Sequence, residues 1–367
     1  MNGEVRVMLC DDSALMRRLI RTAIDSEASL SVVCEAKDGQ DALDKLGEAK
    51  PDIIVMDIEM PVMDGVQAVR EIRRINRNVP IVMFSSLTSR GAQASFDAIA
   101  AGASDFSPKP SGAGHIDQAM DSLKGDLLPK LMFWATRRRI QSGFQGRINR
   151  IPAQPESPQR SQNKSREKVG IVAIGVSTGG PQALAKVFSA LPHDLPVPVV
   201  VAQHMPPVFT GLLAQRLAEQ TGHNVREASG GETLDAGHVL IAPGDHHMTV
   251  ARDGNRFVAK LDRGPPVNSC RPSIDPLFRS VAEFYGRHAL GVVLTGMGQD
   301  GLRGAMRLHE CGARILAQDE ATSVVWGMPG EIAKHGLADR VVAIDRIAHE
   351  ILSALRAGRP RPQATIS

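Results

Sequence analysis

The segment from Gly170 to Pro181 reads Gly-Ile-Val-Ala-Ile-Gly-Val-Ser-Thr-Gly-Gly-Pro and opens the second half of a 367-residue chain. Its first residues, Gly170–Ile174, form an apolar run that predicts a buried strand. Gly179 and Gly180 permit a tight turn, and Pro181 is a preferred residue at the start of a helix. The segment therefore predicts a strand, a turn and a helix, which is the repeating unit of a parallel sheet.

Two further motifs follow strand-like runs in the same half of the chain. They are Gln203-His204-Met205-Pro206 and Thr295-Gly296-Met297-Gly298-Gln299-Asp300-Gly301. Loops that leave the carboxyl ends of parallel strands share one edge of the sheet, where ligands bind. We therefore expect Ser177, His204 and Asp300 to meet there. These are the residue types that nucleophilic hydrolysis requires.

The rest of the chain alternates strand and helix patterns. In residues 1–125 the expected strands are Val5–Cys10, Ser31–Ala36, Asp52–Met56, Val79–Phe84 and Ser104–Phe106. Residues 169–357 alternate in the same way, but 237–262 holds three short strand patterns, which we interpret as an antiparallel excursion. The prediction is an α/β fold with two doubly wound parallel-sheet domains.

A polar segment separates the two halves. Residues 126–168 begin with a helix end and continue as a basic stretch, in which Arg137-Arg138-Arg139 precedes scattered Arg, Gln, Ser and Pro. This composition is typical of a flexible linker. Residues 358–367 form a short polar tail.

Composition argues against several classes of protein. A net charge of +3 and 4% aromatic residues give little support for nucleic-acid binding. Four cysteines without a CxxC pair argue against a zinc or disulfide framework and favour reduced thiols. No apolar run is long enough to span a membrane, and the first residues lack a signal-peptide pattern. We therefore expect a cytoplasmic protein.

Three acidic residues follow strands in the first half. Asp11 and Asp12 end the first strand, and Asp57 ends the third. Neighbouring strand ends would bring these carboxylates together, and their repulsion calls for a divalent cation. Ligation by oxygen alone favours Mg²⁺. A carboxylate held beside Mg²⁺ can attack a phosphoryl group and form an acyl phosphate.

Other strand-end residues complete this predicted phosphate site. Lys109, which precedes a proline, can pair with a phosphoryl group, and Ser85 can donate a hydrogen bond to it. Phe106 is placed to change rotamer when Ser85 moves. With the acidic residues, this set resembles the receiver domain of two-component response regulators. The resemblance implies that Asp57 accepts phosphate from a histidine kinase and that Glu59 offers its backbone carbonyl to the metal.

Ser177 lies in a Gly-x-Ser-x-Gly frame, where a turn between strand and helix exposes its hydroxyl. His204 is the candidate base and Asp300 the acid that orients it. His246 and His247 are rival bases, and Asp300 could instead cap the helix that follows it. The order Ser, His, acid differs from the order in α/β-hydrolases. The dinucleotide-binding fingerprint would need glycine at position 177.

Six motifs of the second half together resemble the chemotaxis methylesterase family, CheB. They are Ile174–Pro181, Gln203–Pro206, Ala242–His247, Asn268–Ser273, Leu294–Gly301 and Gly327–Pro329. The resemblance implies that Ser177 is the nucleophile, His204 the base and Asp300 the orienting acid. It also implies that Met297 is a backbone donor to the oxyanion and that Thr178 supports the site.

With the receiver in front, the resemblance covers nearly the whole chain apart from the linker. It implies a flavodoxin-like receiver followed by a Rossmann-like methylesterase domain. The expected activity is a phosphorylation-activated protein-glutamate methylesterase, which hydrolyses glutamate γ-methyl esters on chemoreceptor helices and deamidates glutamines. Hydrolysis needs no cofactor, whereas phosphorylation of the receiver needs Mg²⁺.

The expected partners are methyl-accepting chemoreceptors and a CheA-type histidine kinase, with contact to the membrane only through the receptors and no nucleic acid. Arg271 is expected either to position substrate or to form an ordinary surface ion pair. Two alternatives stay open. One is a response regulator with a DNA-binding output, which only the basic linker supports. The other is a hydrolase of an unrelated small ester.

Overall fold

The computed structural model describes residues 4–110, 116–134 and 167–357. The chain divides into two compact units, residues 1–154 and residues 155–367. Most of the expected linker and all of the expected tail, 358–367, lie outside the described residues. No described helix combines the length and the apolar character needed to cross a bilayer.

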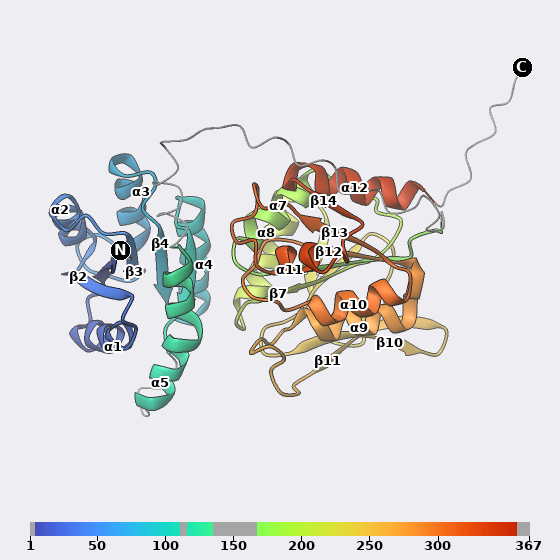
Figure 1. Ribbon diagram of the computed structural model, residues 1–367, viewed down its shortest axis with the longest axis horizontal. Coiled ribbons are helices and arrows are strands. Elements are labelled where there is room, and N and C mark those ends of the chain that lie inside the picture. Colours follow the sequence, from blue (N-terminus) through green and yellow to red (C-terminus); the bar gives the residue numbers. More distant parts are fainter. Residues whose placement is uncertain (1–3, 111–115, 135–166, 358–367) are drawn as a thin grey trace, which may run out of the picture. The chain divides into compact units, whose positions relative to one another are not determined.

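The first unit contains a five-stranded parallel sheet in the order β2-β1-β3-β4-β5 (Figure 1). The strands are β1 (Val5–Cys10), β2 (Leu30–Ala36), β3 (Ile53–Asp57), β4 (Ile81–Ser85) and β5 (Asp105–Pro108). The helices are α1 (Ala14–Asp25), α2 (Gly39–Ala49), α3 (Gly65–Ile75), α4 (Ser89–Ala100) and α5 (Ile116–Ser122). Each strand agrees with its expected range to within two residues, and the α/β prediction is confirmed for this unit.

Polar residues define where the helices of this unit begin. Ser13, Asp38, Asp64 and Thr88 each precede a helix, and each side chain accepts a hydrogen bond from the backbone N–H three residues later. Such a bond satisfies an N–H group that has no partner within the helix. The helix starts therefore follow from the local sequence.

The core of the first unit lies between the sheet and its outer helices. Ile20 and Ile24 of α1 pack with β1, β3 and the helical segment that follows α5. That segment contains a π-helical turn, η1 (Leu123–Leu127), and stays helical through Trp134. Leu131 belongs to the same buried cluster. The expected boundary near residue 125 therefore falls inside a helical segment that contributes to the first core.

The second unit contains a seven-stranded sheet in the order β14-β13-β12-β6-β7-β9-β8, with every neighbouring pair parallel. Its strands are β6 (Ile171–Val176), β7 (Val199–Gln203), β8 (Asn224–Glu227), β9 (His238–Ile241), β12 (Ala289–Val293), β13 (Arg314–Gln318) and β14 (Arg340–Val342). This sheet confirms the parallel α/β prediction for the second half.

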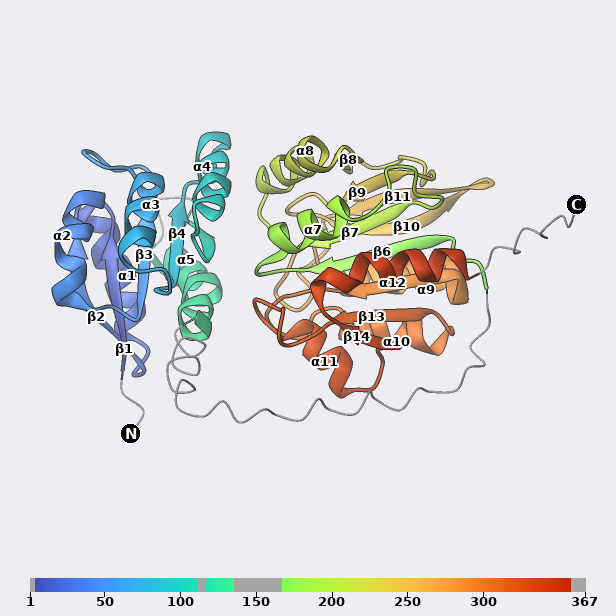
Figure 2. The ribbon, with the colours of Figure 1, turned by 90° about the horizontal axis from the view of Figure 1, so that it is seen from above.

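Helices cover both faces of this sheet (Figure 2). One face carries α7 (Gly180–Ser189), α8 (Phe209–Thr221) and α12 (Ile344–Arg356). The other carries α9 (Ile274–Tyr285), α10 (Leu302–Glu310) and α11 (Met328–Lys334). Phe278 of α9, Leu308 of α10 and Met328 of α11 are fully or almost fully buried in one apolar cluster with the sheet.

Residues 237–262 differ in part from the expected antiparallel excursion. β9 pairs in parallel with β7 and with β8, so it belongs to the main sheet. Only β10 (His247–Asp253) and β11 (Arg256–Asp262) are antiparallel, and they form a separate two-stranded sheet that contacts α9. The reason is burial: Val239–Ile241 are buried on consecutive positions, as in a strand covered on both faces, whereas β10 and β11 have exposed positions.

The order of strands reverses beside β6. On one side of β6 the sheet continues with β7, β9 and β8, and on the other side it continues with β12, β13 and β14, which come later in the chain. In open parallel sheets the crevice at such a reversal is the usual ligand site. The loops that follow β6, β7 and β12 carry Ser177, His204 and Asp300.

Substitution by alanine should change the stability in opposite directions at two glycines of the first unit. A Cβ on Gly65 would lie 2.0 Å from the backbone oxygen of Asp57, so Gly65→Ala should lower stability by about 1–3 kcal/mol. A Cβ on Gly47, an exposed residue of helix α2, would meet nothing within 4 Å. Gly47→Ala should therefore raise stability by about 0.5–1 kcal/mol. Scanning calorimetry of the full chain measures both changes in stability. A Gly65→Ala protein as stable as the wild type would contradict the described packing.

Candidate active site

The carboxyl edge of the first sheet brings Asp11, Asp12 and Asp57 together, with one oxygen of each within 4.8 Å of the others. Lys109 Nζ lies 2.7 Å from Asp57 Oδ2 and 3.0 Å from Asp11 Oδ2. Burial raises the pKa of Asp57 to about 6, although the Lys109 bond acts to lower it. Three carboxylates against one ammonium leave negative charge at this site. The oxygen-only donor set therefore fits Mg²⁺.

Three more residues predicted for the phosphate site lie in β4, in β5 and in the loop after β3. Ser85 is buried, and its hydroxyl donates to the carbonyl of the next residue at 3.2 Å. Phe106 is 8% exposed, and its ring lies 6.5 Å from that of Phe96. The side chain of Glu59 pairs with Arg90 at 3.7 Å. The carboxylate of Glu59 thus has a partner of its own, and the metal prediction concerns only its backbone carbonyl.

In the second unit, three strand-end loops bring Ser177, His204 and Asp300 within hydrogen-bond distance. His204 Nδ1 is 3.1 Å from Ser177 Oγ, and His204 Nε2 is 2.7 Å from Asp300 Oδ2. A carboxylate can only accept, so the hydrogen of a neutral imidazole belongs on Nε2. Nδ1 therefore presents a lone pair to the Ser177 hydroxyl. A base in this position can take the hydroxyl proton.

The Asp300 carboxylate has a full set of donors. Besides His204, it accepts bonds from Asn268 Nδ2, Ser273 Oγ and the N–H of Ile274, each at 2.7 Å. Burial acts to raise the pKa of Asp300, but His204, Ile274 and Ser273 lower it to about 2. The carboxylate is therefore ionised at neutral pH. It also bonds the first turn of α9, and not α10, whose N-cap is a glycine.

A two-residue hairpin turn lies beside this carboxylate. Val267 and Cys270 exchange backbone hydrogen bonds of 3.1 and 3.0 Å around Asn268 and Ser269. These two central residues have φ angles of 52° and 62°. Positive φ at both positions defines a type I′ turn, which asparagine tolerates. The turn brings the Asn268 side chain to Asp300.

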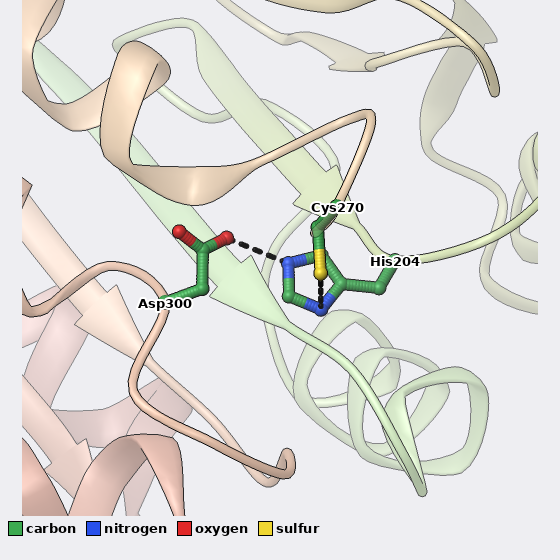
Figure 3. Close-up of side chains that lie close together, drawn as sticks. All are labelled: His204, Cys270 and Asp300. Atoms are coloured by element: carbon green, nitrogen blue, oxygen red, sulfur yellow. Dashed lines mark hydrogen bonds and ion pairs between the residues drawn. The ribbon is translucent and has the colours of Figure 1, made fainter. Parts of the chain in front are cut away.

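The same turn places Cys270 against the imidazole of His204, with Sγ 3.6 Å from Nδ1 (Figure 3). The motif Asn268–Ser273 predicts no role for Asn268, Cys270 or Ser273 from its residues alone. A signal was present, because an Asn-Ser pair between extended residues suits a turn with positive φ. That signal does not reveal which distant side chains the turn meets.

The rival bases have other partners. His247 Nδ1 accepts from the N–H of Ser273 at 3.2 Å, and Nε2 donates to the carbonyl of Pro265 at 3.0 Å. His246 Nε2 accepts from Arg263 at 2.9 Å, and its Nδ1 lies 3.2 Å from a backbone carbonyl. Each ring thus has both nitrogens engaged by groups other than Ser177. Neither offers it a free lone pair.

Arg271 is engaged by its own loop and by the loop between β9 and β10. Its guanidinium pairs with Asp245 and donates to the carbonyls of Arg263, at 3.2 Å, and Gly264, at 2.8 Å. These contacts correspond to the ion-pair alternative for Arg271. They hold the loop that carries the hairpin turn.

Backbone groups near Ser177 define where an oxyanion could be held. The N–H of Ser177 donates to the carbonyl of Thr295 at 3.0 Å, so the nucleophile's own amide is occupied. The N–H groups of Met297 and Thr178 have no acceptor among the residues that the structure describes. A Cβ on Gly296 would lie 2.8 Å from Ser177 Cβ. Glycine is therefore required for this loop to approach Ser177 so closely.

Two curated relatives match almost the whole chain. A protein-glutamate methylesterase/protein-glutamine glutaminase of Trichodesmium erythraeum is 41% identical over 351 residues, which cover 95% of this chain and 98% of the relative. A protein of the same name from a Nocardioides species is 43% identical and covers 97% of each. The chain belongs to the CheB methylesterase family.

Family models and a solved structure agree with this membership. The model for the CheB methylesterase matches residues 172–351, and the model for the response regulator receiver domain matches residues 7–121. The crystal structure of the Thermotoga maritima CheB methylesterase catalytic domain is 39% identical, with a TM-score of 0.50. It covers 51% of this chain and 98% of that chain. The chain is therefore an ester hydrolase joined to a receiver domain.

The surroundings of His204 predict the pH dependence of hydrolysis. Burial acts to lower the pKa of His204, but Asp300 and Cys270 outweigh it and raise the pKa to about 10. Only the neutral imidazole can act as a base, so kcat/KM should rise with pH well above 6.5. Cys270→Ser removes the sulfur that faces His204 and should shift this limb to lower pH. A wild-type limb centred at 6.5 or below in a pH–rate profile would contradict the described contacts.

Asn268 and Ser273 are predicted to position Asp300. Removing one donor, by Asn268→Ala or Ser273→Ala, should cost about 1–1.5 kcal/mol and lower kcat roughly tenfold. KM should change little, because the carboxylate lies behind the imidazole. Asn255→Ala, in the exposed turn between β10 and β11, is the matched control. A loss that appears in KM instead of kcat would assign these side chains to substrate binding.

Proposed function

We propose that this chain is a phosphorylation-activated protein-glutamate methylesterase that acts on chemoreceptors. The observation that carries the proposal is the hydrogen-bonded Ser177–His204–Asp300 triad, which lies where the strand order of the second sheet reverses. The same chain also holds a carboxylate cluster around Asp57. The relatives' name includes protein-glutamine glutaminase. Deamidation uses the same attack on a carbonyl carbon, so we include it as a second activity.

In the proposed reaction, Ser177 Oγ attacks the carbonyl carbon of a glutamate γ-methyl ester while His204 Nδ1 takes its proton. Asp300 stabilises the imidazolium through Nε2–H. The N–H of Met297 donates to the oxyanion, and Thr178 supports the loop beside it. Methanol leaves with the proton from His204. Water, deprotonated by His204, then hydrolyses the acyl-serine and restores the carboxylate.

The proposed metal site consists of Asp11, Asp12 and Asp57, together with the backbone carbonyl of Glu59. When bound, Mg²⁺ would neutralise charge on the transferring phosphoryl group. Ester hydrolysis, by contrast, uses only side chains and backbone groups of the second unit. The proposal therefore assigns Mg²⁺ to the receiver and no cofactor to the esterase.

The proposed switch begins at Asp57, which takes a phosphoryl group from a CheA-type histidine kinase. Lys109, now 2.7 Å from Asp57 Oδ2, would pair with the added negative charge. The hydroxyl of Ser85 would turn from a backbone carbonyl to a phosphoryl oxygen, and Phe106 would adopt a rotamer that suits the new position of Ser85.

The receiver is proposed to restrain the esterase until Asp57 is phosphorylated. The proposed divisions are a receiver at 1–125, a helix end and linker at 126–168, a catalytic domain at 169–357 and a tail at 358–367. Such a switch requires two states whose relative free energy phosphorylation changes. The receptor substrate would place the protein in the cytoplasm.

Methanol release from methylated chemoreceptor membranes tests the reaction. A phosphodonor with Mg²⁺ should stimulate release by the wild-type protein, and removal of Mg²⁺ should abolish this stimulation. Ser177→Ala should lower the rate by about 10³-fold or more because no hydroxyl remains to attack. Ser189→Ala, at the exposed end of α7, is the control. Activity that survives in Ser177→Ala would overturn the assignment of the nucleophile.

A comparison of the full chain with residues 167–367 tests the restraint. The fragment keeps its own sheet and core, so it should hydrolyse receptor esters without a phosphodonor, at a rate several-fold above the unphosphorylated full chain. A fragment no faster than the unphosphorylated chain would contradict the restraint. Absence of methanol from every protein would favour the alternatives, and generic esters and DNA would be assayed next.

A further inference from the structure

His204, Cys270 and Asp300 place a nitrogen, a sulfur and an oxygen donor together at the active site (Figure 3). One ligand atom of each lies within 4.8 Å of the others. Asp300 bonds Nε2 on one side of the imidazole, and Cys270 Sγ lies 3.6 Å from Nδ1 on the other. The nitrogen that faces Cys270 is the one that faces Ser177.

The spacing of nitrogen and sulfur suits a bound metal ion. Zinc bonds of about 2.1 Å to imidazole and 2.3 Å to thiolate, at a tetrahedral angle, separate the two donors by about 3.6 Å. The observed separation of Cys270 Sγ and His204 Nδ1 is 3.6 Å. A thiolate and an imidazole also favour zinc-class ions over Mg²⁺ or Ca²⁺.

The two donors are held in place by surrounding bonds. Cys270 closes the type I′ turn through two backbone hydrogen bonds. Asp300 has four donors, and its bond to Nε2 fixes the orientation of the ring. A carboxylate that accepts from the far nitrogen of a metal-bound histidine is a recurring arrangement, because it orients the ring and increases its basicity.

We propose that the active site binds a zinc-class ion through His204 Nδ1 and Cys270 Sγ, and that this ion inhibits hydrolysis reversibly. The ion replaces the thiol proton of Cys270, which passes to solvent, and accepts the Nδ1 lone pair of His204. Ser177 Oγ or water completes the coordination. Two strong protein ligands make this site weaker than four-ligand structural zinc sites.

Inhibition follows from competition for one lone pair. His204 Nδ1 must be free to take the proton of Ser177, and a metal ion on Nδ1 removes that capacity. This consequence rests on the proposed function, whereas metal binding does not. Among the described residues, the other group of neighbouring ligand atoms is the oxygen-only cluster at Asp57. Hard ions such as Mg²⁺ should therefore bind to the first unit, and zinc-class ions should bind to the second.

The binding experiment titrates the full-length protein with Cd²⁺, and then Zn²⁺ in competition, in excess Mg²⁺ that occupies the receiver carboxylates. Wild type should show a thiolate-to-cadmium absorption band that saturates near one equivalent, and Zn²⁺ should abolish it. Cys270→Ser should lack the band. Cys311→Ser, which alters a partly buried cysteine outside the cluster, should keep it. A band that persists in Cys270→Ser, or no band in wild type, would overturn the proposal.

A second measurement uses the wild-type protein alone and does not depend on how a variant folds. Zn²⁺ should slow alkylation of Cys270 by iodoacetamide at least tenfold, as quantified by mass spectrometry of the Cys270 peptide. A zinc-selective chelator should restore the reaction. Alkylation of Cys270 that proceeds at the same rate with and without Zn²⁺ would refute the site.

The activity arm measures methanol release, with each variant compared with its own metal-free rate. Zn²⁺ should inhibit wild type and Cys311→Ser, and Cys270→Ser should need at least tenfold more Zn²⁺ for the same fractional inhibition. Equal sensitivity of Cys270→Ser would overturn the inhibitory role. A Cys270-dependent cadmium band in a protein that releases no methanol would uphold the metal site and reject the proposed esterase function.

Discussion

The buried carboxylate of Asp300 is the constraint on which the second site depends. An ionised group removed from water is stable only when every oxygen has donors. The four donors come from the loop after β7, the hairpin turn at Asn268 and the start of α9. Because the loop at His204 and the segment 268–274 are distant in sequence from each other and from Asp300, satisfying one buried charge fixes these three parts of the chain together.

Asp57 in the first unit shows how donors decide the state of a buried carboxylate. Both carboxylates are buried, Asp57 at the end of β3 and Asp300 in the loop after β12, but the pKa of Asp57 is raised and that of Asp300 is lowered. Asp57 has Asp11 and Lys109 beside it, whereas Asp300 has His204 and three further donors. A site with spare negative charge can accept a cation and a phosphoryl group. A fully bonded carboxylate can only orient its neighbour.

The proposed ester hydrolysis and its proposed inhibition by a metal ion both use the lone pair of His204 Nδ1. The Ser177 hydroxyl and the Cys270 thiol face this nitrogen at 3.1 and 3.6 Å. The geometry that prepares the base for a proton also prepares it for a soft metal ion. The hairpin turn therefore contacts both side chains of the pair, because Asn268 donates to Asp300 and Cys270 faces His204.

The sequence by itself determined the α/β class, the five strands of the first sheet and the strand-end positions of Ser177, His204 and Asp300, because hydrophobic periodicity and turn residues act locally. Tertiary structure alone decided that β9 joins the main sheet, since a short apolar run suits either kind of pairing. It also decided the partners of His246 and His247, and the contacts of Asn268, Cys270 and Ser273. The contacts Ser273–His247, Asn268–Asp300 and Cys270–His204 span 26, 32 and 66 positions, so they form only where the packed strands bring distant loops together.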